Sequence, residues 1–181
     1  MIIYQNLKTF KMPKGFRGKS KIYVQLWRFL YSILFRMSPQ YMYGWRRILL
    51  RLFGANIGKY VLIRPTAKIL YPWKLTIGDW SWIGDEVTLY NMANINIGKN
   101  CVISQKSYLC TSSHDHNKPS FDIFAELINI KDKVWVASDV FIAPGITIET
   151  GTVVGFRSTV NTNLPAKMIC YGNPAKPMRP R

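Results

Sequence analysis

Two histidines, His114 and His116, provide the only imidazole groups of this 181-residue chain. Imidazole changes its protonation state at about pH 6.5, so it can take a proton from a hydroxyl group near neutral pH. His114 is the better candidate for such a general base, because it lies one six-residue step after Tyr108 and is therefore expected on the end of a coil, where a regular repeat ends and an irregular segment begins. Asp115 beside it, or a backbone carbonyl group, is expected to orient its ring.

The repeat around these histidines places an aliphatic residue at every sixth position between Ile57 and Leu164, with a few interruptions. A period of six fits neither an α-helix nor an alternating strand, and it is typical of a β-helix in which three short strands form one triangular coil. An ordinary β-sandwich would not hold one phase over so many repeats. Seventeen positions are therefore predicted to stack inside a prism: Ile57, Ile63, Ile69, Leu75, Ile77, Ile83, Leu89, Ile95, Ile97, Ile103, Leu109, Ile130, Val136, Ile142, Ile148, Val154 and Val160.

Three parts of the chain are expected from this pattern. Residues 1–53 form an arm and two amphipathic helices, residues 54–165 form the β-helix, and residues 166–181 form a basic tail that leaves the prism. Residues 111–129 exceed what a coil requires, so they are predicted to leave the prism as a loop. Chemistry is often found on loops that a rigid scaffold positions.

The two helices are predicted from apolar residues at helical spacing. Lys21 to Met37, capped by Ser20, would bury one apolar face, and a helix from about Gln40 to Phe53 would bury a second one while its arginines point elsewhere. Neither is long and apolar enough to cross a bilayer. They are expected to cap the open end of the prism, to contact a lipid surface, or both. The residues predicted to be buried are Ile22, Leu26, Phe29, Leu30, Ile33, Leu34 and Met37, then Met42, Trp45, Ile48, Leu49 and Leu52.

The formal charge of +16 is concentrated at the front of the chain, where residues 1–53 contain eleven Lys or Arg and no Asp or Glu. Such a region attracts anionic lipid or a polyanionic cofactor. Nucleic acid is not expected as a partner, because no recognition motif accompanies the charge. Three cysteines without a paired framework and the lack of a cleavable signal indicate a reducing, cytoplasmic setting.

Several segments resemble the hexapeptide-repeat sugar O-acetyltransferases, and most closely the branch of colanic acid biosynthesis acetyltransferases. The resemblance covers nearly the whole chain and rests on ISQKSYLCTSSHDHNKPSF, VWVASDVFIAPG, VVGFRSTVNTNLP, YGNPAKPMR and the long stretch SPQYMYGWRRILLRLFGANIGKYVLIRPTAKILYPWKLTIGDWSWIG. It implies an all-β, left-handed parallel β-helix with an N-terminal helical cap, assembled as a homotrimer. It also implies acetyl-CoA as cosubstrate and no metal.

The resemblance further assigns roles to individual residues. His114, seventeen residues after the Ile97 of an Ile-Gly step, matches the general base of the family. Phe156 and Asn161 depart from the small Ala and the Thr that the family usually has at these positions. The positions matched to the coenzyme A groove are Ser138, Phe156, Asn161 and Thr162, with Lys176 and Arg179 at its phosphates. Local polar groups that could contact the acceptor are Asp85, Asn91, Asn94 and His116.

The function expected from these features is O-acetylation of a sugar hydroxyl in exopolysaccharide or surface-glycan synthesis, on a sugar or lipid-linked glycan. The enzyme would work in the cytoplasm or at the inner face of the cell membrane, with residues 21–53 touching lipid. Alternatives are N-acetylation of an amino sugar and a non-catalytic, membrane-docked scaffold. A zinc enzyme of the same architecture, the γ-type carbonic anhydrase, needs three imidazole ligands, which two histidines supply only by sharing between subunits.

Overall fold

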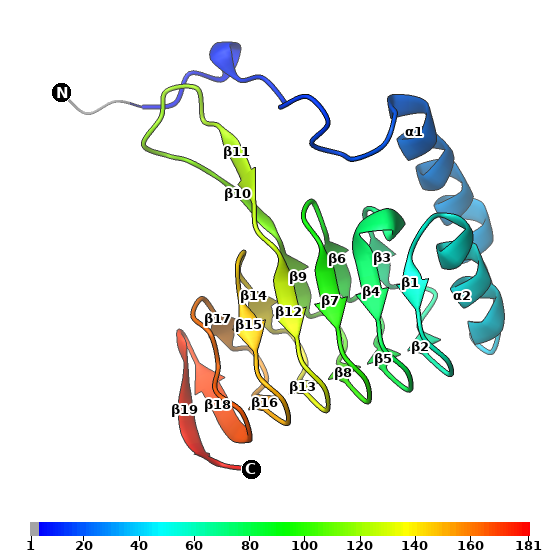
Figure 1. The fold of residues 1–181 in the computed structure, drawn as a ribbon, viewed down its shortest axis with the longest axis vertical. Helices are drawn as coiled ribbons and strands as arrows, with labels where there is room; N and C mark the ends of the chain where they lie inside the picture. Colours follow the sequence, from blue (N-terminus) through cyan, green and yellow to red (C-terminus); the bar gives the residue numbers. More distant parts are fainter. Residues whose placement is uncertain (1–3) are drawn as a thin grey trace.

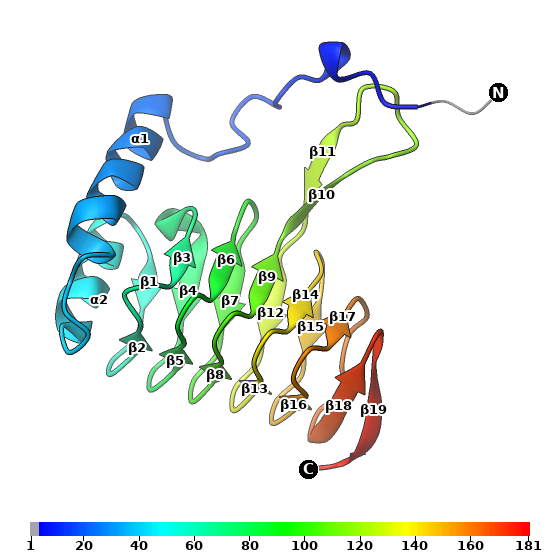
Figure 2. The same ribbon diagram turned by 180° about the vertical axis from the view of Figure 1, so that it is seen from behind.

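The computed structural model describes residues 4–181 and shows a triangular parallel β-helix with two helices at one end (Figure 1). Five coils of three strands follow one another along the prism. Figure 2 shows from behind that a final hairpin closes the end opposite the helices. The strands of the coils are β1 (Asn56–Ile57), β2 (Leu62–Ile63), β3 (Lys68–Ile69), β4 (Leu75–Ile77), β5 (Trp82–Ile83), β6 (Thr88–Tyr90), β7 (Ile95–Ile97), β8 (Val102–Ile103), β9 (Tyr108–Cys110), β12 (Ile128–Ile130), β13 (Trp135–Val136), β14 (Phe141–Ile142), β15 (Thr147–Ile148), β16 (Val153–Val154) and β17 (Thr159–Val160).

The strands stack into three parallel sheets, which are the three faces of the prism. Their orders are β1-β4-β7-β12-β15, β2-β5-β8-β13-β16 with the final hairpin added, and β3-β6-β9-β14-β17. The register places like positions of successive coils opposite each other, such as Ile57 with Ile77 and Ile97 with Ile130. All seventeen predicted inward positions are buried, which confirms the reading of the six-residue period.

Two corners of the prism carry the predicted site residues. The hairpin corner consists of residues 91–94, 111–127, 143–146 and 161–163, which follow β6, β9, β14 and β17. The Ser138 corner consists of residues 84–87, 104–107, 137–140 and 155–158, which precede these same strands. The two corners lie at opposite ends of the same short strands.

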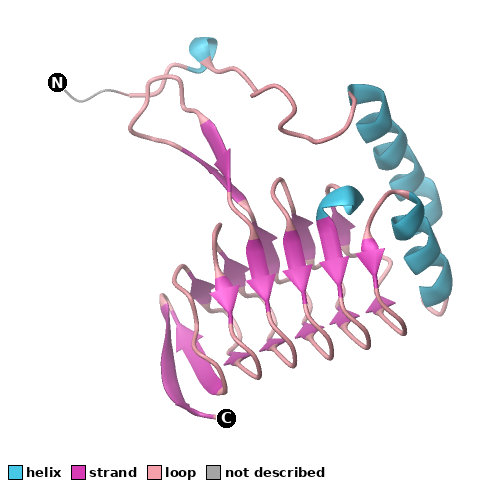
Figure 3. Ribbon diagram, in the orientation of Figure 1, coloured by secondary structure: helices cyan, strands magenta, loops and turns pink. Residues whose placement is uncertain are grey.

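At the hairpin corner, the expected loop is largely an antiparallel hairpin of β10 (Ser112–His114) and β11 (Ile123–Ala125). Figure 3 shows these two strands projecting from the prism. The coil resumes with β12 at Ile128, slightly before the expected end of the loop at residue 129. His114 was expected on the end of a coil, but it lies on the hairpin, because the backbone pairing of β10 with β11 carries the extended chain outward.

The helical cap contains α1 (Lys21–Leu30), a π-helix (Tyr31–Phe35) and α2 (Tyr43–Leu52). The hydroxyl of Ser20 accepts a hydrogen bond from the Tyr23 backbone N–H at 3.2 Å, as a helix N-cap does. The second helix begins later than Gln40, because the Pro39 carbonyl accepts the Met42 N–H and forms a turn there. Gly54, with φ of +86°, follows α2 and leads the chain into the first coil.

The predicted buried faces of both helices were wrong for most of their residues, although Leu49 is buried and Leu30 is partly buried as expected. Val24, Trp27 and Phe35 pack against the prism, whereas most of the predicted apolar residues are exposed. Both stripes of the first helix have helical spacing, so spacing alone could not choose between them. The Trp27 indole N–H donates to the Ile69 carbonyl at 3.0 Å and the Tyr31 hydroxyl donates to the Ala67 carbonyl at 3.0 Å. These two donors satisfy edge carbonyls that an aliphatic face would leave unpaired.

The arginines of α2 were expected to point away, and this was also wrong. Arg46, which is fully buried, donates to the Ile63 carbonyl at 2.6 Å, and Arg47 donates to the Val61 carbonyl at 2.9 Å. Arg51 donates to the carbonyls of Ile57 and Gly58 at 2.6–2.9 Å. The first coil has no coil before it, so some carbonyl groups of its strands receive no hydrogen bond from a backbone N–H. Guanidinium groups supply those donors.

The two ends of the chain are also held by the prism. β18 (Met168–Gly172) pairs with β16, and β19 (Ala175–Pro180) pairs with β18, so the tail extends a sheet where it was expected to leave the prism. The arm crosses from α1 to the tip of the hairpin (Figure 1), where the Asn6 N–H donates to the Pro119 carbonyl at 2.7 Å. The first three residues of the expected arm lie outside the described part. Within residues 4–181, no helix has the length and apolar character that a membrane span requires.

Candidate active site

His114, the last residue of β10, pairs with Ile123 of β11. Its Nδ1 lies 2.7 Å from the carbonyl oxygen of Phe121, and its ring stacks on the Phe121 ring with centroids 4.2 Å apart and planes 4° apart. The Phe10 ring of the arm has its centroid 5.7 Å from that of the imidazole, and the two ring planes are 58° apart. Backbone pairing, one hydrogen bond and two aromatic rings therefore hold the ring in one orientation.

The contact with Phe121 determines which nitrogen of neutral His114 carries the proton. A carbonyl oxygen can only accept, so Nδ1 must donate, and Nε2 keeps its lone pair. This is the tautomer that a general base requires. The orienting group is the backbone carbonyl, the second of the two expected options. Asp115 was the other, but its Oδ1 accepts from the Asn117 backbone N–H at 3.0 Å and its Oδ2 faces Lys118 at 3.7 Å.

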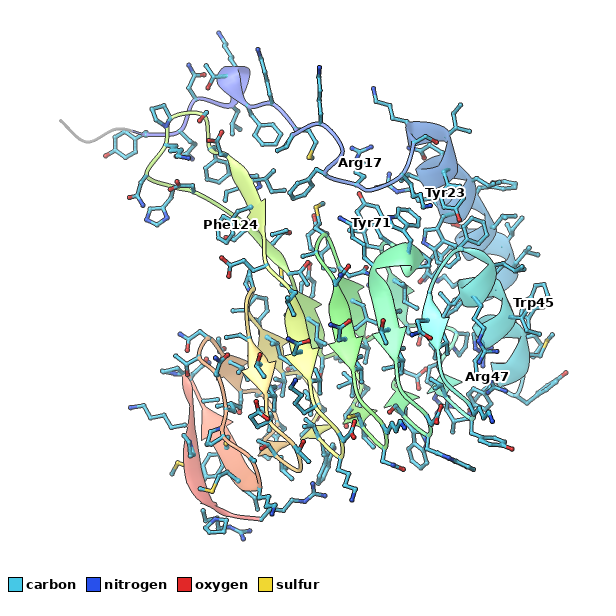
Figure 4. All side chains as sticks on the ribbon, in the orientation of Figure 1. Arg17, Tyr23, Trp45, Arg47, Tyr71 and Phe124 are labelled. Carbon is cyan, nitrogen blue, oxygen red and sulfur yellow. The ribbon has the colours of Figure 1, made fainter. Side chains whose placement is uncertain are left out.

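A cavity of about 940 Å³ opens beside the imidazole, between the arm and the hairpin. In Figure 4, Phe124 lies on the hairpin, away from the region of Arg17 and Tyr71 next to the helices. Arm residues were not predicted to take part in the site, and no local signal in the sequence could have revealed them. The cavity is lined by Lys11, Pro13, Ser113, His114, Asp115, His116, Asn117, Lys118, Asp122, Ile123, Phe124 and Glu126.

The charges of this cavity are mixed. Lys118 lies 3.4 Å from the Asp122 carboxylate as well as 3.7 Å from that of Asp115. A hydrogen bond from Ser120 and the ammonium group of Lys118 lower the pKa of the Asp122 carboxyl. Asp122 is therefore ionised at neutral pH. His116, one of the predicted acceptor-binding residues, is exposed and faces the same cavity as His114.

Four of the predicted cofactor residues, Ser138, Phe156, Lys176 and Arg179, lie at the Ser138 corner or on the final hairpin next to it. The Ser138 carbonyl accepts the backbone N–H of Arg157, which follows Phe156, at 3.0 Å. Phe156 is 73% exposed and lines a cavity of about 430 Å³ that Tyr171 of β18 also lines. Lys176 lies opposite Tyr171 in the β18–β19 pairing, and Arg179 lies opposite Ile169. Tyr171 is a further candidate that sequence reasoning missed.

The remaining cofactor candidates, Asn161 and Thr162, lie elsewhere. Both are exposed on the hairpin corner, in the turn that follows β17. They share that corner with the histidine-bearing hairpin, whereas Ser138 and Phe156 occupy the Ser138 corner. One prism therefore separates the predicted site residues into two groups.

The polar residues proposed for acceptor binding have different surroundings. Asn91 is fully buried, its Oδ1 accepts from the Tyr71 N–H at 2.9 Å and its Nδ2 donates to the Tyr71 carbonyl at 2.6 Å, so the structure contradicts a direct contact with a sugar. Asp85, on the Ser138 corner, pairs with Arg64 at 2.9 Å and accepts from Thr66 at 2.8 Å. Asn94 is exposed on the hairpin corner, and its carbonyl accepts the Ile128 N–H.

The cysteines and other metal-ligating groups are dispersed. Cys101 and Cys170 are buried, and burial raises the pKa of both thiols. The half-buried Cys110 directs its sulfur at the Ser112 carbonyl at 3.1 Å. Among the described residues, no group of three His, Cys, Asp or Glu side chains is arranged to hold a metal ion.

Comparison with known proteins gives close and distant relatives. No protein-family model matches the chain. The acetyltransferase WcaF of Escherichia coli (strain K12), assigned to colanic acid biosynthesis, is 58% identical over 177 residues, which cover 98% of this chain and 97% of that protein. The galactoside O-acetyltransferase of the same organism is 26% identical over 74% of this chain and 68% of its own length.

Solved structures share the fold. A maltose O-acetyltransferase from Clostridium difficile 630 superimposes with a TM-score of 0.82 at 21% identity, covering 92% of this chain and 95% of its own. A galactoside acetyltransferase in complex with coenzyme A gives a TM-score of 0.81 at 22% identity, covering 94% and 84%. The coils of the structure are those of the left-handed β-helix. With 58% identity to one member over nearly its whole length, the chain belongs to the colanic acid biosynthesis acetyltransferases, enzymes of the hexapeptide-repeat fold.

Proposed function

We propose that this acetyltransferase moves the acetyl group of acetyl-CoA to a hydroxyl group of a sugar in an exopolysaccharide or surface-glycan precursor, with His114 as general base. The observation that carries this proposal is the hydrogen bond between His114 Nδ1 and the Phe121 carbonyl oxygen, 2.7 Å long, beside a cavity of about 940 Å³. It leaves Nε2 free to take a proton in a space large enough for a sugar.

In the proposed reaction, Nε2 takes the proton of the acceptor hydroxyl as its oxygen attacks the thioester carbonyl. The carbon–sulfur bond then breaks, and the imidazolium returns the proton to the departing thiolate of coenzyme A. The products are a sugar acetate ester and free coenzyme A. Because the hydroxyl attacks directly, no acyl-enzyme forms, and Cys110 has no part in the chemistry.

Acetyl-CoA as donor is supported by the Ser138 corner and by the relatives. Solved proteins of this fold were crystallised with acetyl-CoA or coenzyme A, among them a hexapeptide-repeat acetyltransferase from Vibrio cholerae at 24% identity and a TM-score of 0.82. In this chain, Phe156 and Tyr171 line a cavity of about 430 Å³, and Lys176 pairs with Tyr171. Apolar rings suit the pantetheine arm of coenzyme A, and cations beside them suit its phosphates. Lys176 and Arg179 would hold the phosphates.

The same placement supports a homotrimer. The histidine lies on the hairpin corner and the cation-bearing hairpin continues the sheet next to the Ser138 corner, so the two groups occupy different corners of one prism. If neighbouring prisms pack side by side, the hairpin corner of one protomer can meet the Ser138 corner of the next. The acceptor would be a sugar or lipid-linked glycan at the inner face of the cell membrane.

The test combines acetyl-CoA, candidate sugar and lipid-linked sugar acceptors, and mass spectrometry of the products. The wild-type protein should add one acetyl group, and His114→Ala should lose about 10²- to 10⁴-fold in kcat while its circular dichroism is unchanged. His116→Ala, on the same hairpin, should affect chiefly the acceptor KM. Equal turnover by His114→Ala would refute the proposed base.

The same products separate O- from N-acetylation. An acetate ester is removed by mild alkali or hydroxylamine, whereas an N-acetyl group survives both. Loss of the added mass after this treatment supports transfer to a hydroxyl group. A retained mass would assign the enzyme to amino sugars, and a wild-type protein that transfers nothing to any acceptor would favour a non-catalytic scaffold.

A further inference from the structure

The segment from α1 through the π-helix to Met37, just after it, presents to solvent an apolar surface, here called the outer stripe, of Ile22, Leu26, Phe29, Ile33 and Met37. Steps of four, three, four and four residues place these side chains on one side of the helix. Ile22 is 82% exposed, Phe29 is 62% exposed and Met37 is 76% exposed. The opposite side of the same helix, with Val24 and Trp27, is packed on the first coil. This segment is therefore apolar on two sides, and among residues 4–181 only one of them has a packing partner.

Exposed apolar residues also lie in and just before α2. Tyr41, Ile48 and Leu52 are exposed large apolar residues. The indole N–H of Trp45 donates to the Leu34 carbonyl at 2.8 Å and joins the two helical segments. Figure 4 shows Trp45 on the outer side of α2, facing away from the prism. The exposed apolar surface thus spans both segments of the cap.

Basic residues border this apolar surface. Lys21, Arg28 and Arg36 are exposed on the helical segment that carries the outer stripe. Residues 1–53 contain eleven Lys or Arg and no Asp or Glu. No ion pair among residues 4–181 includes a cation of this region. In the described part of the chain, Lys21, Arg28 and Arg36 therefore have no acidic partner.

This combination of features favours one kind of partner. A second copy that docked by the same surface would bring Lys21, Arg28 and Arg36 close to their own copies, and like charges in contact oppose association. A neutral protein surface would leave the cations without partners. Apolar side chains between cations match a bilayer surface, whose phosphates attract the cations while its acyl region receives the apolar groups.

We propose that the outer stripe binds the surface of a bilayer that contains anionic phospholipid. The first helix would lie parallel to the membrane, with Ile22, Leu26, Phe29 and Ile33 in the boundary between headgroups and acyl chains. Lys21, Arg28 and Arg36 would reach the lipid phosphates. The proposal adds a membrane-binding surface to the proposed function, but lipid binding can be measured without any acetyl transfer.

The experiment is flotation of the full-length protein with vesicles of phosphatidylcholine alone or mixed with phosphatidylglycerol. The protein should float with the mixed vesicles and not with the neutral ones, and added salt should weaken the binding. The double variant Phe29→Ser/Ile33→Ser should bind at least about 10-fold more weakly, because two large apolar groups no longer leave water. Its thermal unfolding should stay close to that of the wild type, since both side chains are exposed.

Two control variants make the result specific. Trp80→Ser removes an aromatic side chain of similar exposure, 55%, from a turn of the prism, and it should bind vesicles as the wild type does. His114→Ala should also bind fully, so a wrong assignment of the base would not affect the membrane result. Equal flotation of the double variant, or equal binding to neutral vesicles, would overturn the proposal. A change of solution mass in the double variant would instead identify the outer stripe as an interface between copies.

Discussion

A hydrogen bond of 2.7 Å between His114 Nδ1 and the Phe121 carbonyl oxygen holds the imidazole with Nε2 available as an acceptor. The ring is also covered by Phe121 and approached by Phe10. A carbonyl group keeps its acceptor character at every pH, so the orientation of the ring does not depend on the titration of a neighbour. Asp115, adjacent in sequence, instead stabilises the turn at Asn117.

Substitution of Asp115 tests this division of roles. Asp115→Asn should lower kcat by less than about 10-fold, because the amide keeps an oxygen for the Asn117 N–H and the imidazole keeps its carbonyl partner. His114→Asn should lower kcat by about 10²-fold or more. Steady-state kinetics of both variants at saturating acetyl-CoA provide the comparison. An equal loss in the two variants would show that Asp115 belongs to the catalytic pair.

At the scale of elements, the cap stabilises the first coil by supplying donors to the carbonyl groups of all three of its strands. Arg51 donates to β1, Arg46 donates to β2, Arg47 donates to Val61 just before β2, and Trp27 donates to β3. The buried Arg46 also donates to Ser38 at 2.8 Å, Pro39 at 2.9 Å and Gln40 at 2.5 Å, which fixes the connection between the helices. Burial lowers the pKa of its guanidinium, but the group stays charged at neutral pH.

Replacement of Arg46 should therefore be costly. Arg46→Met keeps much of the volume but leaves buried carbonyl groups without donors, so the free energy of unfolding should fall by about 2–4 kcal/mol. Arg36→Met, at an exposed position of the cap, should change it by less than about 0.5 kcal/mol. Urea denaturation followed by circular dichroism measures both. Similar values for the two variants would remove the donor role assigned to Arg46.

A second element-scale feature is the aromatic ladder on the face formed by β6, β9 and β14. The Tyr108 ring lies between two other rings. Its centroid is 6.1 Å from that of Tyr90 and 5.8 Å from that of Phe141, on which it stacks with 21° between the ring planes. Burial, and then the nearby Cys110 and Tyr90, raise the pKa of Tyr108 from 10.0 to about 12. Burial also raises the pKa of Tyr90.

This shift predicts a loss of stability in alkali. The folded state keeps the Tyr108 proton up to about pH 12, whereas the unfolded chain loses it near pH 10.0, so unfolding releases a proton between these values. The contribution of Tyr108 to the free energy of unfolding is complete below pH 10.0 and declines as the pH rises toward 12. Thermal unfolding at several pH values in this window should show a smaller decline in Tyr108→Phe. An identical decline in the wild type and the variant would mean that other groups dominate the loss of stability in alkali.

At the scale of the whole molecule, the proposed site would combine residues of two protomers. His114 is on the hairpin corner, while Lys176 and Arg179 are on the hairpin that extends the sheet beside the Ser138 corner. A homotrimer would bring these groups together three times. Its mass in sedimentation experiments should be three times the 21.0 kDa of the chain.

Mixed assemblies test the shared site directly. His114→Ala and the double variant Lys176→Ala/Arg179→Ala should each be nearly inactive at low acetyl-CoA concentration. Trimers formed by co-expression of the two should regain part of the activity, because some sites combine an intact histidine with intact cations. Co-expression of His114→Ala with His114→Asn is the matched control, which should stay inactive. No recovery in the first mixture, despite mixed trimers, would place the whole site within one chain.

The sequence alone determined the prism, its seventeen inward residues and the existence of two capping helices. An inward residue at every sixth position is a local property of each strand, and Ser20 is an N-cap through its own neighbours, so both are readable without a fold. The position of His114 at the departure from the coils was equally visible. Family membership follows from the same motifs, and 58% identity to one relative bears it out.

Only the tertiary structure decided which helix faces pack, what orients His114 and what lines its cavity. Two stripes of α1 have helical spacing, and the edge carbonyls of the first coil selected the one with Trp27 because it carries a donor. Phe10 and Lys11 reach the histidine from the other end of the chain. Such contacts depend on where distant segments meet in space, and no local periodicity encodes that.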